Sequence, residues 1–127
     1  MAIPTIASRL QRKLIVMSRD EAVLSALRGA LPTEWQMVET LDLENIGDFQ
    51  DILQHRFMLL DLDEYDAFDP LDVIRAVRME MMLNLPIFCF GGAQDVRDEA
   101  RLSRADRFFE RDEIVEKMKL FCQQYQW

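Results

Sequence analysis

The sequence predicts an α/β domain with a parallel sheet of five strands and helices on both of its faces. Five short apolar runs follow one another along the 127 residues, and each precedes a stretch that is compatible with a helix. Several of the runs are continuous instead of alternating with polar residues, which is typical of parallel strands buried on both faces. Because strand and helix alternate throughout, we expect a doubly wound sheet.

The first two strand-helix pairs are predicted in residues 14–53. The run at 14–17 is the first strand, and Pro32 ends the helix that follows it. That helix is defined by the apolar residues Ala22, Val23, Ala26, Leu27, Ala30 and Leu31. A weaker strand is predicted at 35–38. The second helix is predicted from apolar residues at spacings of three and four, namely Leu43, Ile46, Phe49 and Leu53.

The other three pairs are predicted in residues 57–125. The run at 57–60 is typical of a strand buried on both faces, and Asp69-Pro70 begins the helix of 71–81. The run at 86–90 is the fourth strand, and the polar stretch 93–103 is compatible with a helix. A short strand at 107–109 precedes the last helix, whose core face is formed by Ile114, Met118, Phe121 and Tyr125.

The composition indicates one domain at 13–127, preceded by an N-terminal arm at 1–12. Hydrophobic types make up 50% of the chain, enough for one core. The net charge is −8 and the basic residues are scattered, which argues against nucleic-acid binding and favours protein partners. No apolar run has the length of a membrane span or signal peptide, and Cys89 and Cys122 read as buried hydrophobes. We therefore expect a soluble, cytoplasmic protein that does not bind membranes.

Ligand sites of such sheets lie at the carboxyl ends of the strands, so the residues that follow each run are the candidates for chemistry. These residues are Ser18 and Arg19, the stretch 61–66, Gly91-Gly92, and Glu110-Arg111. The acids of 61–69 lack the glycine and the terminal glutamate of a calcium loop and are interpreted as a solvated loop. Gly91-Gly92 lacks a phosphate-loop pattern and is interpreted as a tight turn.

Three short motifs resemble the receiver domain of bacterial response regulators, the CheY-like family. They are Leu59-Leu60-Asp61, Leu85-Pro86-Ile87-Phe88, and Ala105-Asp106-Arg107-Phe108-Phe109 before Arg111. The resemblance covers roughly residues 13–126 and implies a flavodoxin-like fold with strand order 2-1-3-4-5. It also implies a phospho-accepting aspartate after strand three, an acidic pair that holds Mg²⁺, a Thr or Ser after strand four and a Lys after strand five.

Residue by residue, the resemblance implies an atypical member, a pseudo-receiver. Asp61 matches the phosphoacceptor, but Ser18 and Arg19 stand at the acidic pair, with Asp20 one place beyond. Gly91 replaces the switch hydroxyl, Phe108 occupies the aromatic switch position, and Arg111 replaces the Lys. Because Mg²⁺ prefers carboxylates, we expect no metal and no other cofactor here.

The replacement residues suggest that cationic side chains neutralise Asp61 from within. A pair of unit charges ~4 Å apart interacts by about 4 kcal/mol at an effective dielectric constant of 20, before desolvation. Arg19 and Arg111 are both candidate neighbours, and our hypothesis is that Arg19 takes the place of the metal cation.

The function expected from the resemblance is signalling by protein docking or dimerisation, with little or no Mg²⁺-dependent phosphorylation and no enzymatic activity. The expected contact face comprises the fourth helix, the fifth strand and the last helix. Its candidate contact residues are Arg97, Arg101, Arg104, Lys117 and Lys119. The alternative is a working phosphoacceptor, with Mg²⁺, that a histidine kinase phosphorylates on Asp61. A nucleotide- or flavin-binding domain ranks last, because the sequence has no phosphate-loop signature.

Overall fold

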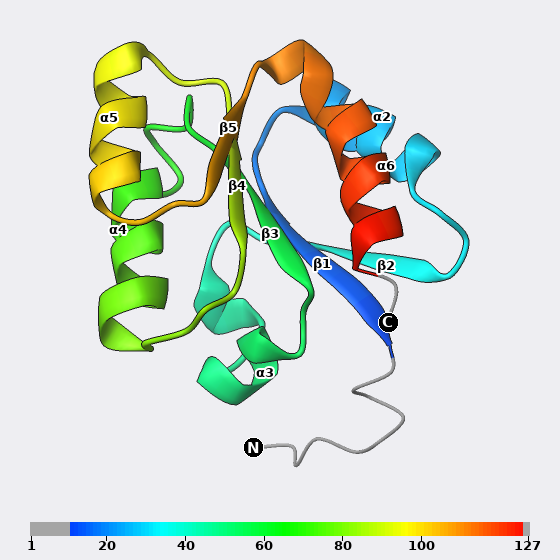
Figure 1. The fold of residues 1–127 in the computed structure, drawn as a ribbon, viewed down its shortest axis with the longest axis horizontal. Helices are drawn as coiled ribbons and strands as arrows, with labels where there is room; N and C mark the ends of the chain where they lie inside the picture. Colours follow the sequence, from blue (N-terminus) through cyan, green and yellow to red (C-terminus); the bar gives the residue numbers. More distant parts are fainter. Residues whose placement is uncertain (1–10, 126–127) are drawn as a thin grey trace.

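A computed structural model describes residues 11–125 of the chain (Figure 1). Its centre is a sheet of five parallel strands in the order β2-β1-β3-β4-β5. The strands are β1 (Arg12–Met17), β2 (Trp35–Glu39), β3 (Phe57–Asp61), β4 (Ile87–Phe90) and β5 (Arg107–Phe109). The predicted fold class and strand order are confirmed.

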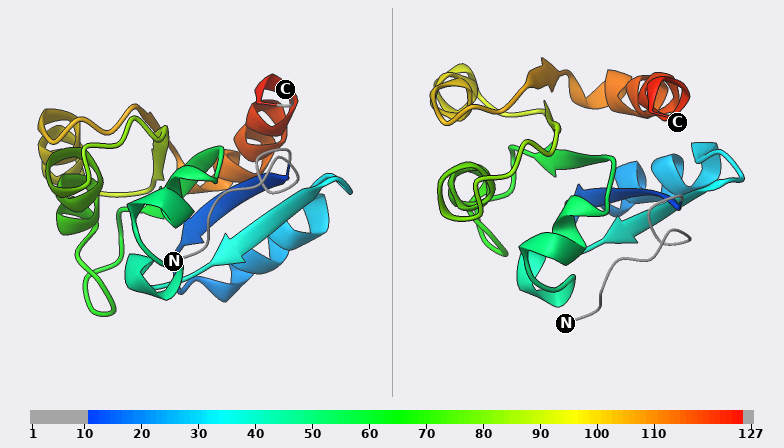
Figure 2. Two further views of the ribbon diagram at one scale, coloured as in Figure 1. Left: turned by 90° about the horizontal axis from the view of Figure 1, so that it is seen from below. Right: turned by 60° about the horizontal axis from the view of Figure 1, so that its bottom comes forward.

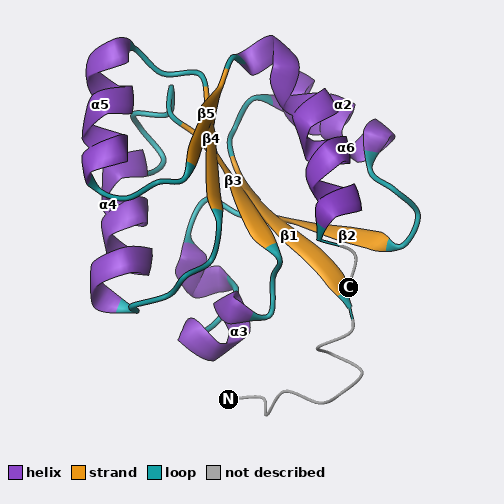
Figure 3. Cartoon of the chain, viewed as in Figure 1, coloured by secondary structure: helices purple, strands orange, loops and turns teal. Residues whose placement is uncertain are grey.

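Helices cover both faces of the sheet (Figures 2 and 3). One face is covered by α2 (Glu21–Ala30) and α6 (Ile114–Gln124), which lie to the right of the sheet in Figure 1. The other face is covered by η1 (Leu43–Asn45), α3 (Phe49–Leu53), α4 (Pro70–Arg75) with its continuation η2 (Ala76–Glu80), and α5 (Gln94–Leu102). A short turn of helix, η3 (Arg111–Glu113), joins β5 to α6.

The central strand β3 is buried along its whole length, as its unbroken apolar run predicts. Alternate side chains enter the two cores, because successive residues of a strand point to opposite faces. Phe57 lies at the centre of an aromatic cluster beneath α6, with ring centroids 5.6–5.9 Å from those of its neighbours Trp35, Phe88, Phe121 and Tyr125. Met58 and Leu60 enter the opposite core. β3 therefore holds the residue at its carboxyl end in a rigid position.

The single helix predicted across 43–53 is wrong. Gly47, with a φ of 136°, separates η1 from α3, and Asp48 begins α3 with a capping box that it forms with Asp51. Because α3 begins at Asp48, its apolar face is rotated relative to that of a single helix over 43–53. Ile52 is consequently buried, whereas Phe49 and Leu53, which were predicted to face the core, are exposed.

Two other helices differ in detail from the predictions. Leu24 and Leu27 form the buried face of α2, while Ala22 and Ala26 of the predicted face are exposed. The predicted helix of 71–81 ends in the π-helical turn η2, where the N–H of Met81 donates to the carbonyl of Ala76, five residues back. The core face of this segment is still the predicted one, with Ile74 and Val77 fully buried.

The proposed N-terminal arm lies outside the described residues except for Gln11 and Arg12, and Arg12 already begins β1. The arm and the domain boundary therefore stay predictions. Both cysteines are buried and free, as predicted, and burial raises the pKa of each thiol to about 12. Within residues 11–125, none of the helices combines the length and the apolar character needed to cross a membrane.

Candidate functional site

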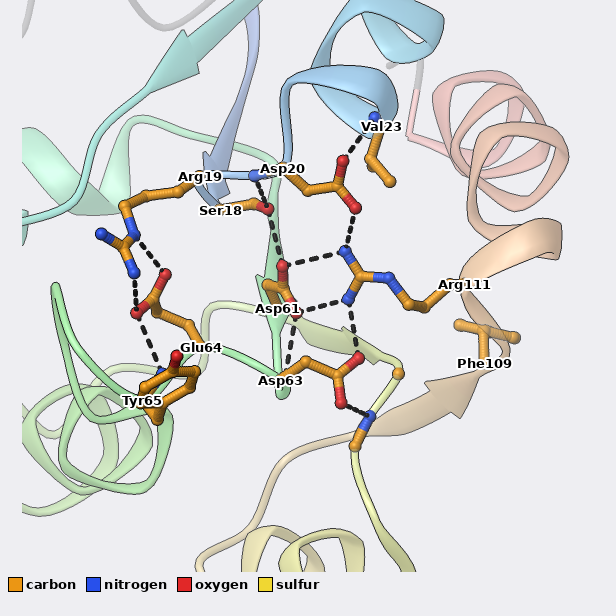
Figure 4. A network of polar contacts seen from close by, with 12 residues as sticks. Ser18, Arg19, Asp20, Val23, Asp61, Asp63, Glu64, Tyr65, Phe109 and Arg111 are labelled. Atoms are coloured by element: carbon orange, nitrogen blue, oxygen red, sulfur yellow. Dashed lines mark hydrogen bonds and ion pairs between the residues drawn. The ribbon is translucent and has the colours of Figure 1, made fainter.

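Asp61, the predicted phosphoacceptor, lies at the carboxyl end of β3 and is only 4% exposed. Its carboxylate accepts four hydrogen bonds (Figure 4). Oδ2 accepts from the Ser18 hydroxyl at 2.7 Å and from Arg111 Nη2 at 3.1 Å. Oδ1 accepts from Arg111 Nη1 at 2.6 Å and from the Asp63 backbone N–H at 2.9 Å. The carboxylate oxygens are thus fully engaged by the protein itself.

Arg111 is the cation that pairs with Asp61. It begins η3 directly after β5, and its guanidinium forms two parallel hydrogen bonds to Asp61, the bidentate geometry that an arginine can form and a lysine cannot. Arg111 also donates to Asp20 Oδ2 at 2.5 Å and to Asp63 Oδ2 at 2.8 Å. Its guanidinium carbon lies 5.1 Å from the centre of the Phe90 ring, which adds a cation–π contact. We call Arg111 with Asp20, Asp61 and Asp63 the arginine cluster.

Asp20 is held in the arginine cluster from the start of α2. Its Oδ1 caps that helix by accepting from the N–H groups of Ala22 and Val23. The hydrogen bond from Arg111 lowers the pKa of the Asp20 carboxyl below its ordinary value. Ser18 connects the two acids, because its hydroxyl donates to Asp61 and accepts from the Asp20 N–H at 3.0 Å. The position beyond the predicted acidic pair therefore belongs to the site.

The turn after β4 fits closely against the arginine cluster. Gly91 has a φ of 72°, and a Cβ at this position would lie 2.2 Å from Asp63 Oδ2 and 3.0 Å from Arg111 Nη1. Gly92, with a φ of 85°, donates its N–H to Asp63 Oδ1 at 3.0 Å. Both glycines have the positive φ values that glycine tolerates best, and the tight turn expected for them stays a prediction. At position 91 the backbone conformation and the adjacent side chains both disfavour a larger residue.

The hypothesis that Arg19 takes the place of the metal cation beside Asp61 is wrong. Arg19 points away from Asp61, and its Nε and Nη2 donate to Glu64 at 2.7 and 3.2 Å (Figure 4). A weaker pair joins it to Asp66 at 3.5 Å. The reason is the alternation of an extended chain, which directs Ser18 and Asp20 towards Asp61 and Arg111 and places Arg19 between them on the opposite side.

Glu64 is a buried carboxylate that sequence reasoning missed, because the acids of 61–69 were interpreted as a solvated loop. Its Oε2 accepts from the backbone N–H groups of Tyr65, Asp66 and Ala67 at 2.7–2.9 Å. The hydrogen bond from Arg19, together with these backbone N–H groups, lowers the pKa of Glu64 to about 2. This carboxylate therefore shapes the loop between β3 and α4. No spacing in the sequence marks Glu64 as buried, and the opposite charge of Arg19 was the one signal that could have suggested the pair.

The pH dependence of stability reports on Glu64. Because the pKa of Glu64 is depressed in the folded state, its contribution is complete above the ordinary value of 4.5 and is lost as the pH falls towards 2. We expect Glu64→Gln to make the free energy of unfolding fall less steeply than in the wild type between these values, as measured by urea titration. Glu80→Gln, at an exposed glutamate, is the matched control and should stay close to the wild type. Equal slopes for wild type and Glu64→Gln would contradict the prediction.

Phe108, the predicted aromatic switch residue, is half-buried on β5 and packs against the core beneath α5. The guanidinium of Arg101 covers its ring, with the guanidinium carbon 4.8 Å from the ring centre. Arg97, a predicted contact residue, instead points inwards and donates to the carbonyls of Gly91 and Phe109 at 2.9 and 3.1 Å. The structure thus brings Ser18, Asp61, Gly91 and Arg111 together, and it leaves Arg19 and Phe108 outside the cluster.

The residues at this edge of the sheet do not fit Mg²⁺. The ion prefers carboxylate oxygens and water in octahedral geometry. Here a hydroxyl and a guanidinium contact Asp61, and Arg111 lies among the three carboxylates of the arginine cluster. Among residues 11–125, no three or more His, Cys, Asp or Glu side chains are grouped so that they could hold a metal ion.

No protein-family model matches the sequence, and no curated protein matches it either. Solved structures of receiver domains do match the fold. The phosphorylated cyanobacterial phytochrome response regulator RcpA is 13% identical, with a TM-score of 0.72 over 91% of this chain and 94% of that chain. A signal receiver domain from Bermanella marisrubri is 24% identical, with a TM-score of 0.66 over 84% and 93% of the two chains.

The receiver domain of TorR, the response regulator of the TMAO respiratory system, is 16% identical, with a TM-score of 0.69 over 90% of this chain and 98% of that chain. The chain therefore has the fold of response-regulator receiver domains, as the motifs around Asp61 and Phe108 implied. At this level of identity, the likeness concerns the fold, and the function has to be argued from the site.

Proposed function

We propose that this protein is an atypical receiver module of signal transduction, which acts by binding proteins and not by Mg²⁺-dependent phosphorylation of Asp61. The observation that carries the proposal is the bidentate pair between Arg111 and Asp61. Either oxygen of the Asp61 carboxylate would have to attack the phosphoryl group, and each of them already accepts two hydrogen bonds. A phosphoryl donor would have to displace a guanidinium that three carboxylates hold in place.

The replacement of the Lys by Arg111 is central to this proposal. A lysine presents a compact ammonium group that turns easily between partners, whereas the planar guanidinium of Arg111 bridges Asp20, Asp61 and Asp63 at once. The hydrogen bond with Asp61 raises the pKa of Arg111 above its ordinary value, and an arginine is in any case charged at every physiological pH. The positive charge is supplied permanently by the chain.

A second candidate function is favoured by the place of Asp61. This residue lies at the carboxyl end of the central strand, as the phospho-accepting aspartate of the receiver family does. In this alternative, a histidine kinase phosphorylates Asp61 with Mg²⁺, and Arg111 moves aside to pair with the phosphoryl group. An arginine is well suited to binding phosphate, so the alternative is chemically sound.

Acetyl phosphate with Mg²⁺ distinguishes the two candidates. We expect the wild type to gain no phosphoryl group by intact-protein mass spectrometry, and beryllofluoride to leave the amide signals of Ser18, Asp61 and Gly91 unshifted in ¹⁵N NMR spectra. Asp61→Asn is the matched control, since it keeps the shape of the side chain and removes the nucleophile. A mass gain in the wild type that Asp61→Asn abolishes would establish the phosphoacceptor instead.

The face formed by α5, β5 and α6 is the contact surface that we propose for a protein partner or a homodimer. Arg101, Arg104 and Arg107 are exposed there, and Lys117 lies 5.6 Å from the ring centre of Phe109. Leu102 is 77% exposed among these basic residues. The same NMR spectra, recorded at increasing protein concentration, test for a homodimer: shifts confined to this face would support one.

A further inference from the structure

A groove of 340 Å³ lies between the loop after β2 and the helix α4, on the side of the sheet that α3 and α5 also cover. Its floor is apolar and is formed by Met17, Leu43, Phe68, Val73, Ala76 and Met81. Phe68 and Met81 are half-buried, and Leu41 at one edge is 37% exposed. A ligand could therefore reach apolar surface there without unfolding any element.

The rim of this groove is uniformly acidic. It carries Asp42, Glu44, Asp69, Asp72 and Glu80, all exposed, and no lysine or arginine lines the groove within residues 11–125. Two of these carboxylates cap helices: Asp42 accepts from the Glu44 N–H and Asp69 from the Leu71 N–H. Among residues 11–125, Asp72 is the only one of these five acids that forms an ion pair, with Arg75 at 3.4 Å. The rim thus carries negative charge that the described part of the chain leaves largely uncompensated.

The groove lies beside the carboxyl ends of the strands. Met17, the last residue of β1, lines it together with residues of the loops that follow β2 and β3, which lead to α3 and α4 on one face of the sheet. The crevice at the switch point between β1 and β3 belongs to the arginine cluster, because Asp20 follows β1 and Asp61 ends β3. The groove is separate from the arginine cluster, since none of Asp20, Asp61, Asp63 or Arg111 lines it.

We propose that this groove binds an amphipathic helix of a protein partner, with apolar residues towards the floor and lysine or arginine residues towards the rim. An apolar floor between acidic edges is complementary to such a helix, which would bring one apolar stripe and flanking positive charges. The acidic rim would repel an anionic membrane surface. The site is distinct from the face of α5, β5 and α6, which carries exposed basic and acidic residues side by side, and it does not depend on the state of Asp61.

A designed peptide tests the groove on the full chain. The probe is a peptide of Leu and Lys in which Leu recurs at i, i+3, i+4 and i+7, titrated into ¹⁵N-labelled protein. We expect shifts at residues 41–44 and 68–81, and we expect Asp72→Asn combined with Glu80→Gln to weaken binding about fivefold. Glu99→Gln combined with Glu116→Gln removes the same charge from α5 and α6, and should weaken binding by less than about twofold.

A second matched pair of variants tests the apolar contribution to peptide binding. Leu41→Ser, at the edge of the groove, should weaken binding of the peptide, whereas Leu120→Ser, on the exposed side of α6, should not. Equal weakening by the two charge pairs would overturn the proposal, since binding would then follow net charge alone. Three other results would also overturn the proposal. They are equal affinity for a peptide with Glu in place of Lys, NMR shifts that map to another face, and NMR shifts at the groove that accompany self-association without peptide. Acetyl phosphate plays no part, so the outcome is independent of whether Asp61 is phosphorylated.

Discussion

Arg111→Met is expected to lower the free energy of unfolding by about 3 kcal/mol at neutral pH. The substitution keeps an unbranched stem over the Phe90 ring and removes the only cation that contacts Asp20, Asp61 and Asp63 among the described residues. Asp61 is nearly inaccessible to water and would lose two of its four hydrogen bonds. Urea unfolding followed by circular dichroism measures the change. The lower part of the 3–5 kcal/mol range for broken buried pairs applies, since Arg111 itself is partly exposed.

Two comparisons make the result specific to the arginine cluster. Arg101→Met removes an exposed arginine that stacks on Phe108 and pairs with Asp98 at 3.3 Å, and should cost about 0.5 kcal/mol. Combining Arg111→Met with Asp61→Asn should cost less than the sum of the two single changes, by about 2 kcal/mol. Additive effects, or an Arg111→Met protein as stable as Arg101→Met, would contradict the proposed role of the pair.

The loss caused by Arg111→Met should also shrink in acid. Arg111 depresses the pKa of Asp20 below its ordinary value of 3.8, so in the wild type this contribution is present above that pH and is lost as the pH falls further. In Arg111→Met the contribution is missing at every pH. The two stability curves should therefore converge as the pH falls below about 4.

Gly91→Ala is expected to lower the free energy of unfolding by about 2 kcal/mol. The φ of 72° places residue 91 in the left-handed region, which costs a residue with a Cβ roughly 1–2 kcal/mol. The new methyl group would also push Asp63 out of its hydrogen bonds with Arg111 and the Gly92 N–H. Gly91→Ser should behave in the same way, although a hydroxyl residue is what phosphorylated members of the receiver family carry here.

Gly29→Ala provides the matched control for Gly91→Ala. Gly29 lies within α2, and a Cβ added to it would meet nothing within 4 Å. An alanine in a helix is favoured over a glycine, so this variant should be more stable than the wild type by about 0.5–1 kcal/mol. If both alanine variants shifted stability in the same direction, the close fit between Gly91 and the arginine cluster would be refuted.

Much of the fold could be predicted from the sequence, because burial leaves a strong pattern in it. The continuous run that ends at Asp61 reads as a strand buried on both faces, and the strand is fully buried. The failure between Leu43 and Leu53 has a local cause. Leucine and phenylalanine at helical spacing resembled one helix, but Gly47 and the capping box of Asp48 divide the segment in two. A glycine followed by a capping aspartate was the signal that could have placed the boundary.

The site was predicted in part. Asp61 and Arg111 could be placed as neighbours, because both follow strands whose carboxyl ends share one edge of the sheet. Which arginine pairs with Asp61 depended on side-chain direction. Ser18 and Asp20 share a side and Arg19 lies opposite, which is the alternation expected of an extended chain. The backbone N–H groups that surround Glu64 could not be predicted, because they depend on the conformation of one loop.

The contact between Gly91 and Arg111 also limits how this sequence can change over evolutionary time. A hydroxyl residue at position 91 would be costly while Asp63 and Arg111 keep their places, and losing Arg111 would be costly while three carboxylates remain around it. Each substitution is thus harmful by itself. Reciprocal sign epistasis of this kind separates the present site from one that binds phosphate, and selection against the single mutants would preserve the arginine even in a lineage that had no use for it.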